Sequence, residues 1–258
     1  MVVYFLLRRR FRLGEAVFLE QDPSVKKLGK KEAAIFFSQF AFDFLSLMFV
    51  GLVVGARLGY VLFYNPGYYL SHPLAIISPF AEGTGQFVGI YGLSYHGGLV
   101  GIVLAALFFA RKRGLNFWLL ADFVVPAVPL GYFFGRLGNF FNGELYGRET
   151  ERLWGMFFPA DELGLLRHPS QLYEAFFEGL VLFLLVWKVR NHAFFRGNLF
   201  WLYLLGYGAF RILCEFFREP DEQLGYVFAS LTMGQIMSFL MLFSPLVFFA
   251  WKKIKNLL

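Results

Sequence analysis

The densest polar chemistry of the sequence lies in residues 135–149, GRLGNFFNGELYGRE. This segment contains two arginines, two asparagines, two glutamates and four glycines. An arginine guanidinium is a planar fork that binds a phosphate or a carboxylate, an asparagine amide both donates and accepts hydrogen bonds, and glycine lets a ligand approach the backbone closely. The composition favours an anion-binding site at the membrane surface, and the alternative is an amphipathic loop closed on itself by ion pairs.

Three charged residues share one helix face in residues 207–221, YGAFRILCEFFREPD. Arg211, Glu215 and Arg218 have the spacing that places side chains next to one another on a helix. Charges near the end of a membrane span are costly unless they pair or serve a ligand. The trio therefore predicts either an Arg–Glu pair that ties two helices together or arginines that face a bound anion.

A histidine and a polar stripe complete the set of candidate groups. His96 lies in SYHGGLVG, where a neutral imidazole could accept a proton from a thiol, and a structural histidine is the alternative. In RHPSQLYEAFFEG we expect a capped helix with an inward polar face formed by Gln171, Glu174 and Glu178.

The elements that must position these residues are apolar segments long enough to cross a bilayer. Of the 258 residues, 58% are hydrophobic and 16% are charged, and the mean hydropathy is +0.56, whereas soluble domains are roughly 45–50% apolar and about 25% charged. We expect an all-α fold, a polytopic membrane helical bundle that forms a single domain over residues 1–258. The first span is partial, at residues 1–7, and six full spans follow at residues 38–63, 93–110, 116–134, 172–187, 197–217 and 232–251.

Lysine and arginine set the orientation of these spans. Alternating spans place the basic clusters on one side, and the clusters lie in residues 8–31, 111–113, 188–196 and 252–255. We assign that side to the cytoplasm, which gives a multi-pass protein of the bacterial cytoplasmic (inner) membrane with a cytoplasmic C-terminus. Residues 135–171 then form a small outer-side head region, and the active site faces the outer side.

The net charge and the numbers of cysteines and histidines limit the classes of partner and ligand that we expect. The net charge of +6 comes from basic residues between apolar runs, which favours an anionic membrane surface over nucleic acid. The single cysteine, Cys214, forms no internal disulfide, and the four histidines lack metal-ligand spacing. We expect no nucleic-acid partner, no metal and no cofactor. Arginines facing a cavity would also suit an anion or lipid transporter, but transporters often contain internal repeats and none is visible.

Five motifs occur in one order: GARLGYVLFYN, YHGGLVG, GRLGNFFNGELYGR, RHPSQLYE, and YGAFRILCEFFREPD followed by QLGY. In their amino-acid sequences and in their order along the chain, these motifs resemble those of the prolipoprotein diacylglyceryl transferase family over residues 26–251. The resemblance implies transfer of the diacylglyceryl group of phosphatidylglycerol to the lipobox cysteine thiol of a prolipoprotein. The products would be a thioether and glycerol phosphate, in the first step of lipoprotein maturation. Phosphatidylglycerol, prolipoprotein signal peptides and membrane lipids are the expected partners, and we expect a monomer.

The resemblance also implies which residues bind phosphatidylglycerol. Arg136 would bind the phosphate, and Arg211 matches a second functional position of the family. Asn139 matches a further motif position, and we expect it to position the headgroup.

Four other positions match functional residues of the family: Gly147, Glu144, Glu215 and His96. We expect Glu144 and Glu215 to orient the two arginines. His96 matches the histidine of the HGG motif, and we expect it to accept the thiol proton.

One position departs from the family pattern. Members carry a tyrosine-glycine motif in the outer half of the first span, whereas residues 1–7 begin after that point and Tyr4 lies too far along to replace it. We expect a start codon placed too late rather than an altered site. An altered site would instead favour a catalytically silent relative that binds lipid.

Overall fold

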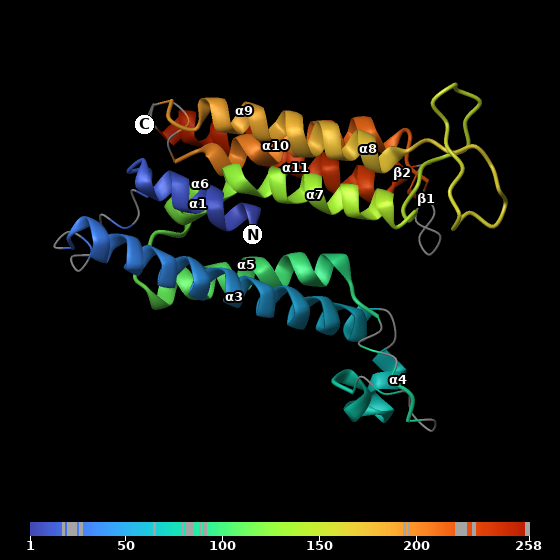
Figure 1. Ribbon diagram of the computed structural model, residues 1–258, viewed down its shortest axis with the longest axis horizontal. Coiled ribbons are helices and arrows are strands. Elements are labelled where there is room, and N and C mark those ends of the chain that lie inside the picture. The colour runs from blue at the N-terminus through green and yellow to red at the C-terminus, as the bar shows by residue number, and fades with distance from the viewer. Residues whose placement is uncertain are drawn as a thin grey trace. The chain divides into compact units, whose positions relative to one another are not determined.

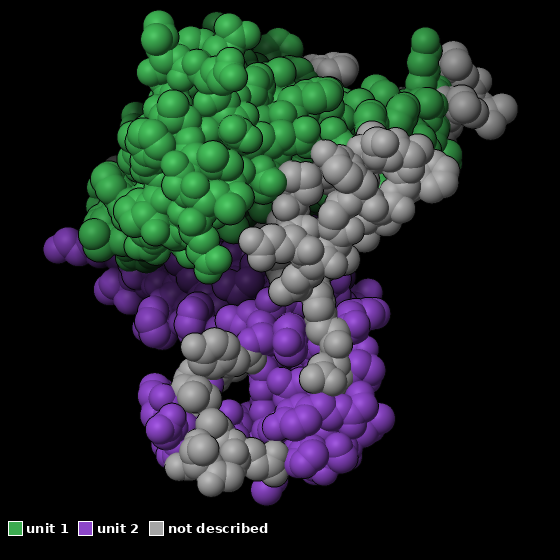
Figure 2. Space-filling model, turned by 90° about the vertical axis from the view of Figure 1, so that its right-hand side faces the viewer, with its two compact units in different colours: residues 1–15, 121–258 green, residues 16–120 purple. Residues whose placement is uncertain are grey.

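The computed structural model describes the chain except for residues 17–18, 20–24, 26–27, 64–65, 79, 81–84, 88, 90–91, 193–194, 196, 220–225, 229–230 and 256–258. For residues 30, 95–96, 226–228, 231–233 and 254–255 it describes the backbone alone. The chain divides into two compact units, residues 16–120 and residues 1–15 with 121–258 (Figure 2).

Two long helices that lie along each other form about half of residues 16–120 (Figure 1). The Arg113 guanidinium, just past the end of the second helix, pairs with Asp43 Oδ2 of the first at 2.6 Å, and both side chains are exposed. The elements of this unit are α3 (Lys30–Phe63), α4 (Pro66–Ser71), the 3-10 turn η2 (Pro73–Ile76) and α5 (Tyr95–Lys112), and α6 (Phe117–Val124) begins within it.

Glycines line the contact between α3 and α5. A Cβ placed on Gly59 would lie 2.7 Å from Gly97 Cα, and one on Gly51 would lie 2.7 Å from the Cβ of Ala105. Small residues let the backbones of membrane helices approach closely. An alanine at either glycine would force α3 and α5 apart.

Helices also dominate residues 1–15 with 121–258, where α10 lies along α11 and α7 lies along η4 (Figure 1). An apolar cluster of Val125, Leu182, Val186 and Leu199 packs η3 against α9 and the start of α10. The elements are α1 (Val2–Arg12), the end of α6, the 3-10 turn η3 (Val125–Ala127), α7 (Val128–Phe141), α8 (Ser170–Glu174), the π-helical segment η4 (Ala175–Val181), α9 (Leu182–Val189), α10 (Leu199–Glu215), β1 (Tyr226–Phe228), β2 (Leu231–Thr232) and α11 (Met233–Lys255).

Two local features bring the polar faces of α7 and η4 together. Pro126 and Pro129 are buried and stand in the first turns of η3 and α7, where a missing backbone N–H costs least. Gly179 of η4 packs on α7, since an added Cβ would lie 2.7 Å from the Cβ of Phe133. The two segments therefore pack with their backbones unusually close.

A loop region without helices joins α7 to α8 and extends past the ends of these helices (Figure 1). Its extended segments are joined by isolated antiparallel β-bridges, which pair Arg167 with Glu149 and with Met156. Arg167 also pairs with Asp161, with Nε at 2.9 Å from Oδ2. These contacts give the predicted head region a compact base.

The helical membrane architecture predicted from the sequence is confirmed. Among the described residues, three helices are long and apolar enough to cross a membrane: Lys31–Phe63, Phe117–Phe141 and Gly234–Lys253. The other three predicted spans are helical too, as α5, as α8 with η4 and α9, and as α10. The pair β1–β2 departs from the all-α expectation, and residues 1–7 belong to a helix that continues to Arg12.

Candidate active site

Arg136 of α7 lies against a buried carboxylate. Its Nε stands 2.6 Å from Glu174 Oε2, and the Glu174 side chain is fully buried. The Tyr132 hydroxyl, one turn earlier on α7, accepts a hydrogen bond from Arg136 Nε at 2.8 Å and donates one to Glu174 Oε2 at 3.1 Å. The guanidinium is therefore held by two groups at once.

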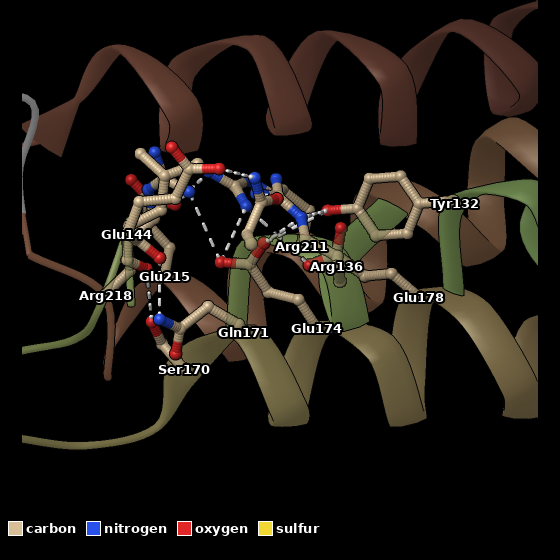
Figure 3. Close-up of polar contacts among 12 residues, drawn as sticks. Tyr132, Arg136, Glu144, Ser170, Gln171, Glu174, Glu178, Arg211, Glu215 and Arg218 are labelled. Atoms are coloured by element: carbon tan, nitrogen blue, oxygen red, sulfur yellow. Dashed lines mark hydrogen bonds and ion pairs between the residues drawn. The ribbon is translucent and has the colours of Figure 1, made fainter. Parts of the chain in front are cut away.

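Glu174 connects three arginines: Arg136 of α7, Arg211 of α10, and Arg218, which lies just past the end of α10 (Figure 3). Its Oε1 lies 3.4 Å from Arg211 Nη1 and 3.4 Å from Arg218 Nη1, while Oε2 contacts Arg136. A single carboxylate of α8 therefore joins α7 to the end of α10.

Arg211 has a second partner on its own helix. Its Nη2 lies 2.8 Å from Glu215 Oε2 one turn further along α10, and Glu215 is buried. The first turn of α11 covers Glu215, since a Cβ on Gly234 would lie 2.7 Å from Glu215 Oε1. The predicted orienting role of Glu215 toward Arg211 therefore has a direct contact to support it.

Asn139 and Glu144 form the exposed end of the same cluster. Asn139 Nδ2 donates to Glu144 Oε1 at 2.7 Å, and Arg136 Nη1 donates to Asn139 Oδ1 at 3.4 Å. The structure thus places Glu144 next to Asn139, and Glu144 reaches Arg136 through that amide. Gln171 Nε2 fixes the loop by donating to the backbone oxygen of Glu144 at 2.7 Å.

Gly147 lies where the head region meets the end of α10. Its backbone nitrogen donates to the carbonyl oxygen of His168 at 2.8 Å, and it forms a β-bridge with Arg218. An added Cβ would lie 2.8 Å from His168 O and would also collide with the carbonyl oxygen of Phe217. Only glycine fits between these two backbone strands.

His96 belongs to residues 16–120, in the first turn of α5. The turn is capped by Ser94, whose Oγ accepts a hydrogen bond from Gly97 N at 3.3 Å. The side chain of His96 lies outside the described part of the chain. The expected role of His96 as proton acceptor stays a prediction.

The head region beside the cluster carries perturbed groups of its own. The hydrogen bond from Arg167 holds the pKa of Asp161 below its usual value. Burial and then the charge of Arg152 lower the pKa of His168, whose Nδ1 lies 3.1 Å from the Tyr173 hydroxyl. The Asp161 carboxylate therefore stabilises the folded head at neutral pH, and protonation of His168 destabilises it in acid.

Three members of the cluster have no site role predicted from the sequence: Glu174, Glu178 and Tyr132. The two glutamates share an inward polar face with Gln171, and that spacing is the signal that they belong to a buried network. Tyr132 lies in an apolar segment, and only its spacing of one turn from Arg136 pointed to it.

The cluster as a whole suits a bound phosphate. Arginines in a water-poor site stabilise negative charge more strongly than in water, and guanidinium groups bind phosphate oxygens in pairs. The mostly buried arginines are Arg136, Arg211 and Arg218, and the buried glutamates are Glu174, Glu178 and Glu215.

Comparison with known proteins points to a family whose members act on a phospholipid. Residues 24–251 match the sequence model of the prolipoprotein diacylglyceryl transferase family. The chain is 49% identical over 213 residues to the phosphatidylglycerol–prolipoprotein diacylglyceryl transferase of Chlorobaculum tepidum, covering 82% of this chain and 74% of that protein. It is 50% identical over 204 residues to that of Wolinella succinogenes (78% and 73%) and 46% identical over 209 residues to that of Campylobacter jejuni (80% and 75%). The chain belongs to the prolipoprotein diacylglyceryl transferase family.

Proposed function

We propose that Arg136 and Arg211 hold the phosphate of phosphatidylglycerol while its diacylglyceryl group passes to the lipobox cysteine of a prolipoprotein. As a member of its family, the protein is a transferase of lipoprotein biosynthesis that uses these two substrates. The observation that carries the placement is the buried Glu174, which holds both guanidinium groups within 3.4 Å. The two cations are thereby fixed next to each other.

The chemistry is displacement at a glyceryl carbon. The cysteine sulfur forms a bond to that carbon, the carbon–oxygen bond to phosphate breaks, and glycerol phosphate leaves with the bonding pair. Charge gathers on the phosphate as the bond breaks, so fixed arginines stabilise the transition state more than the bound lipid. A thiol with a pKa of about 8.5 is mostly protonated at neutral pH, and we assign His96 as its proton acceptor.

Neighbouring residues position the two arginines. Glu215 orients Arg211 through the contact at 2.8 Å. Glu144 orients Asn139, which positions the headgroup and contacts Arg136. Gly147 lets the head region lie against the end of α10.

The membrane arrangement is part of the same proposal. The two units form one transferase domain with six full spans and a partial N-terminal span in the bacterial inner membrane. The basic clusters put the C-terminus in the cytoplasm and residues 135–171 on the outer side, so the site opens to the side where lipid-anchored proteins mature. The protein works as a monomer, on phosphatidylglycerol and prolipoprotein signal peptides.

The experiment is transfer of labelled diacylglyceryl from phosphatidylglycerol to a lipobox peptide. Arg136→Ala and Arg211→Ala should each lower the rate by about a hundredfold or more, the cost of removing one donor that stabilises a developing anion. Arg113→Ala is the matched control, because its exposed pair with Asp43 lies in the other unit, and it should leave the rate unchanged. A near-normal rate in folded Arg136→Ala or Arg211→Ala protein refutes the placement.

A further inference from the structure

Glu178 is the one buried glutamate of the cluster that the two arginines of the proposed phosphate site leave without a close contact. It lies in the π-helical segment η4 and is fully buried. Its carboxylate faces the Tyr132 hydroxyl and the Cys214 thiol, but among the described residues no donor makes a well-formed hydrogen bond to either oxygen. Its nearest ion-pair atom, Arg211 Nη1, stands 3.8 Å from Oε1. π-helical turns inside helices are frequent at functional sites.

Each of the other two buried glutamates has a close ion pair with an arginine. Glu174 lies 2.6 Å from a nitrogen of Arg136, and Glu215 lies 2.8 Å from one of Arg211. A buried carboxylate without close pairing and hydrogen bonds is costly as an anion and is favoured in its neutral form. The geometry therefore singles out Glu178 as the member that carries a proton.

The charge of the cluster leads to the same residue. The buried part of the cluster holds three arginines and three glutamates, and their charges cancel when every group is ionised, so this part would offer a lipid phosphodiester no net attraction. One proton on a glutamate leaves a single positive charge, which equals the charge of one phosphodiester anion in magnitude. Glu178 can supply that charge without breaking the close ion pairs of Glu174 and Glu215.

We propose that Glu178 is protonated in the resting enzyme and so gives the arginine cluster the net positive charge that a phosphatidylglycerol headgroup neutralises. The inference rests on the proposed placement of the phosphate on Arg136 and Arg211. Glu178 is a positioning residue, since it acts through Arg211 at 3.8 Å. In Figure 3 it lies toward Tyr132, and Glu144 lies at the opposite end of the cluster.

The groups that face Glu178 come from each element around η4. Tyrosine and cysteine are neutral at neutral pH, so the charged neighbours are two arginines and one carboxylate. Lys188 of α9 lies about 15 Å further along the same helix. The neighbours are Tyr132 and Arg136 of α7, Glu174 of α8, and Arg211 and Cys214 of α10.

The proposal links lipid binding to a proton. Because the anion binds to the protonated site, raising the pH until Glu178 ionises weakens binding by up to tenfold per pH unit. A glutamine at position 178 keeps the neutral shape and has no proton to lose. Its affinity for phosphatidylglycerol is then the same at every pH.

The first test is infrared spectroscopy of the full-length protein at neutral pH. Wild type should show the carbonyl band of a buried carboxylic acid, and Glu178→Gln should lack it. Glu219→Gln is the matched control, because its carboxylate is exposed and pairs with Arg167 outside the cluster, so its loss should leave the band in place. A wild-type spectrum without the band, or a band that survives in Glu178→Gln, overturns the proposal.

The second test measures binding of a short-chain phosphatidylglycerol between about pH 5 and pH 9. Over the interval in which the band disappears, wild-type affinity should fall by up to tenfold per pH unit, and that of Glu178→Gln should stay constant. Constant wild-type affinity through that interval overturns the proposal. Undiminished binding by Arg136→Ala would instead refute the phosphate placement, whatever the infrared band shows.

Discussion

Glu174 holds the guanidinium of Arg136 at 2.6 Å from inside the bundle, and the two residues come from different helices, α8 and α7. The same carboxylate reaches two arginines at the end of α10. The site and the packing of its helices therefore depend on one side chain.

Replacing Glu174 by glutamine should damage stability and activity together. Removing one partner of a buried ion pair leaves uncompensated charge and costs about 3–5 kcal/mol. Thermal unfolding in detergent measures the first effect, and diacylglyceryl transfer measures the second. Glu219→Gln is the control, since its arginine keeps Asp161 as a partner and the change should cost under about 1 kcal/mol. Wild-type stability of Glu174→Gln would show that the carboxylate is not the link.

Tyr132→Phe should separate activity from folding. The ring stays, with its edge-to-face contact to Tyr207, while the hydroxyl that bridges Arg136 and Glu174 is lost. Hydrogen bonds to charged groups contribute about 1.5–3 kcal/mol, so the transfer rate should fall by about tenfold or more. The assay is phosphatidylglycerol turnover at saturating peptide, with unfolding temperature measured in parallel. An unchanged turnover rate would remove Tyr132 from the site.

Gly147→Ala should displace the head region from the end of α10. The added methyl group collides with the carbonyl oxygens of Phe217 and His168, and such overpacking costs about 1–3 kcal/mol. We expect faster proteolysis within the head and a large loss of transfer. Gly67→Ala is the control, because nothing lies within 4 Å of its added Cβ. Equal behaviour of the two variants would contradict the steric explanation.

Acid should loosen the head region through Asp161. The Arg167 hydrogen bond lowers the folded-state pKa of this carboxyl, so its stabilising effect is complete above the unfolded pKa of about 3.9 and is lost as pH falls through the folded value. Proteolysis of the head as the pH is lowered measures this. The head of Asp161→Asn should be cleaved faster than that of wild type at neutral pH. Its cleavage rate should rise less than that of wild type when the pH is lowered below about 5. Identical acid profiles for the two proteins would count against the Asp161–Arg167 contact.

The sequence predicted the helices well, because each apolar run is long and bounded by charges or glycine. The resemblance of its motifs implied Arg136 and Arg211 as phosphate ligands, and that role stays a prediction. The sequence could not predict that Glu174 joins them, because a polar stripe tells which face is inward but not which helix lies opposite. The π-helical turn at Glu178 left no mark in the side-chain pattern, since it is a change of backbone hydrogen bonding.

Gly147 shows, for a single residue, the same difference between what a sequence motif predicts and what only the folded structure reveals. Its place in the motif marked it as functional, but the reason is the carbonyl oxygen of Phe217, which follows it by seventy positions in the chain. Contacts of that kind arise only after the chain has folded.

The helix α3 is longer than one crossing of a bilayer requires. From Asp43 to Phe63 it rises about 30 Å, which is already the thickness of the hydrocarbon layer. The turns from Lys30 to Phe42 are therefore surplus to a single crossing, and the exposed pair of Asp43 and Arg113 lies where they join the rest of the helix. A helix with such a surplus fits bilayers of different thickness by changing its tilt.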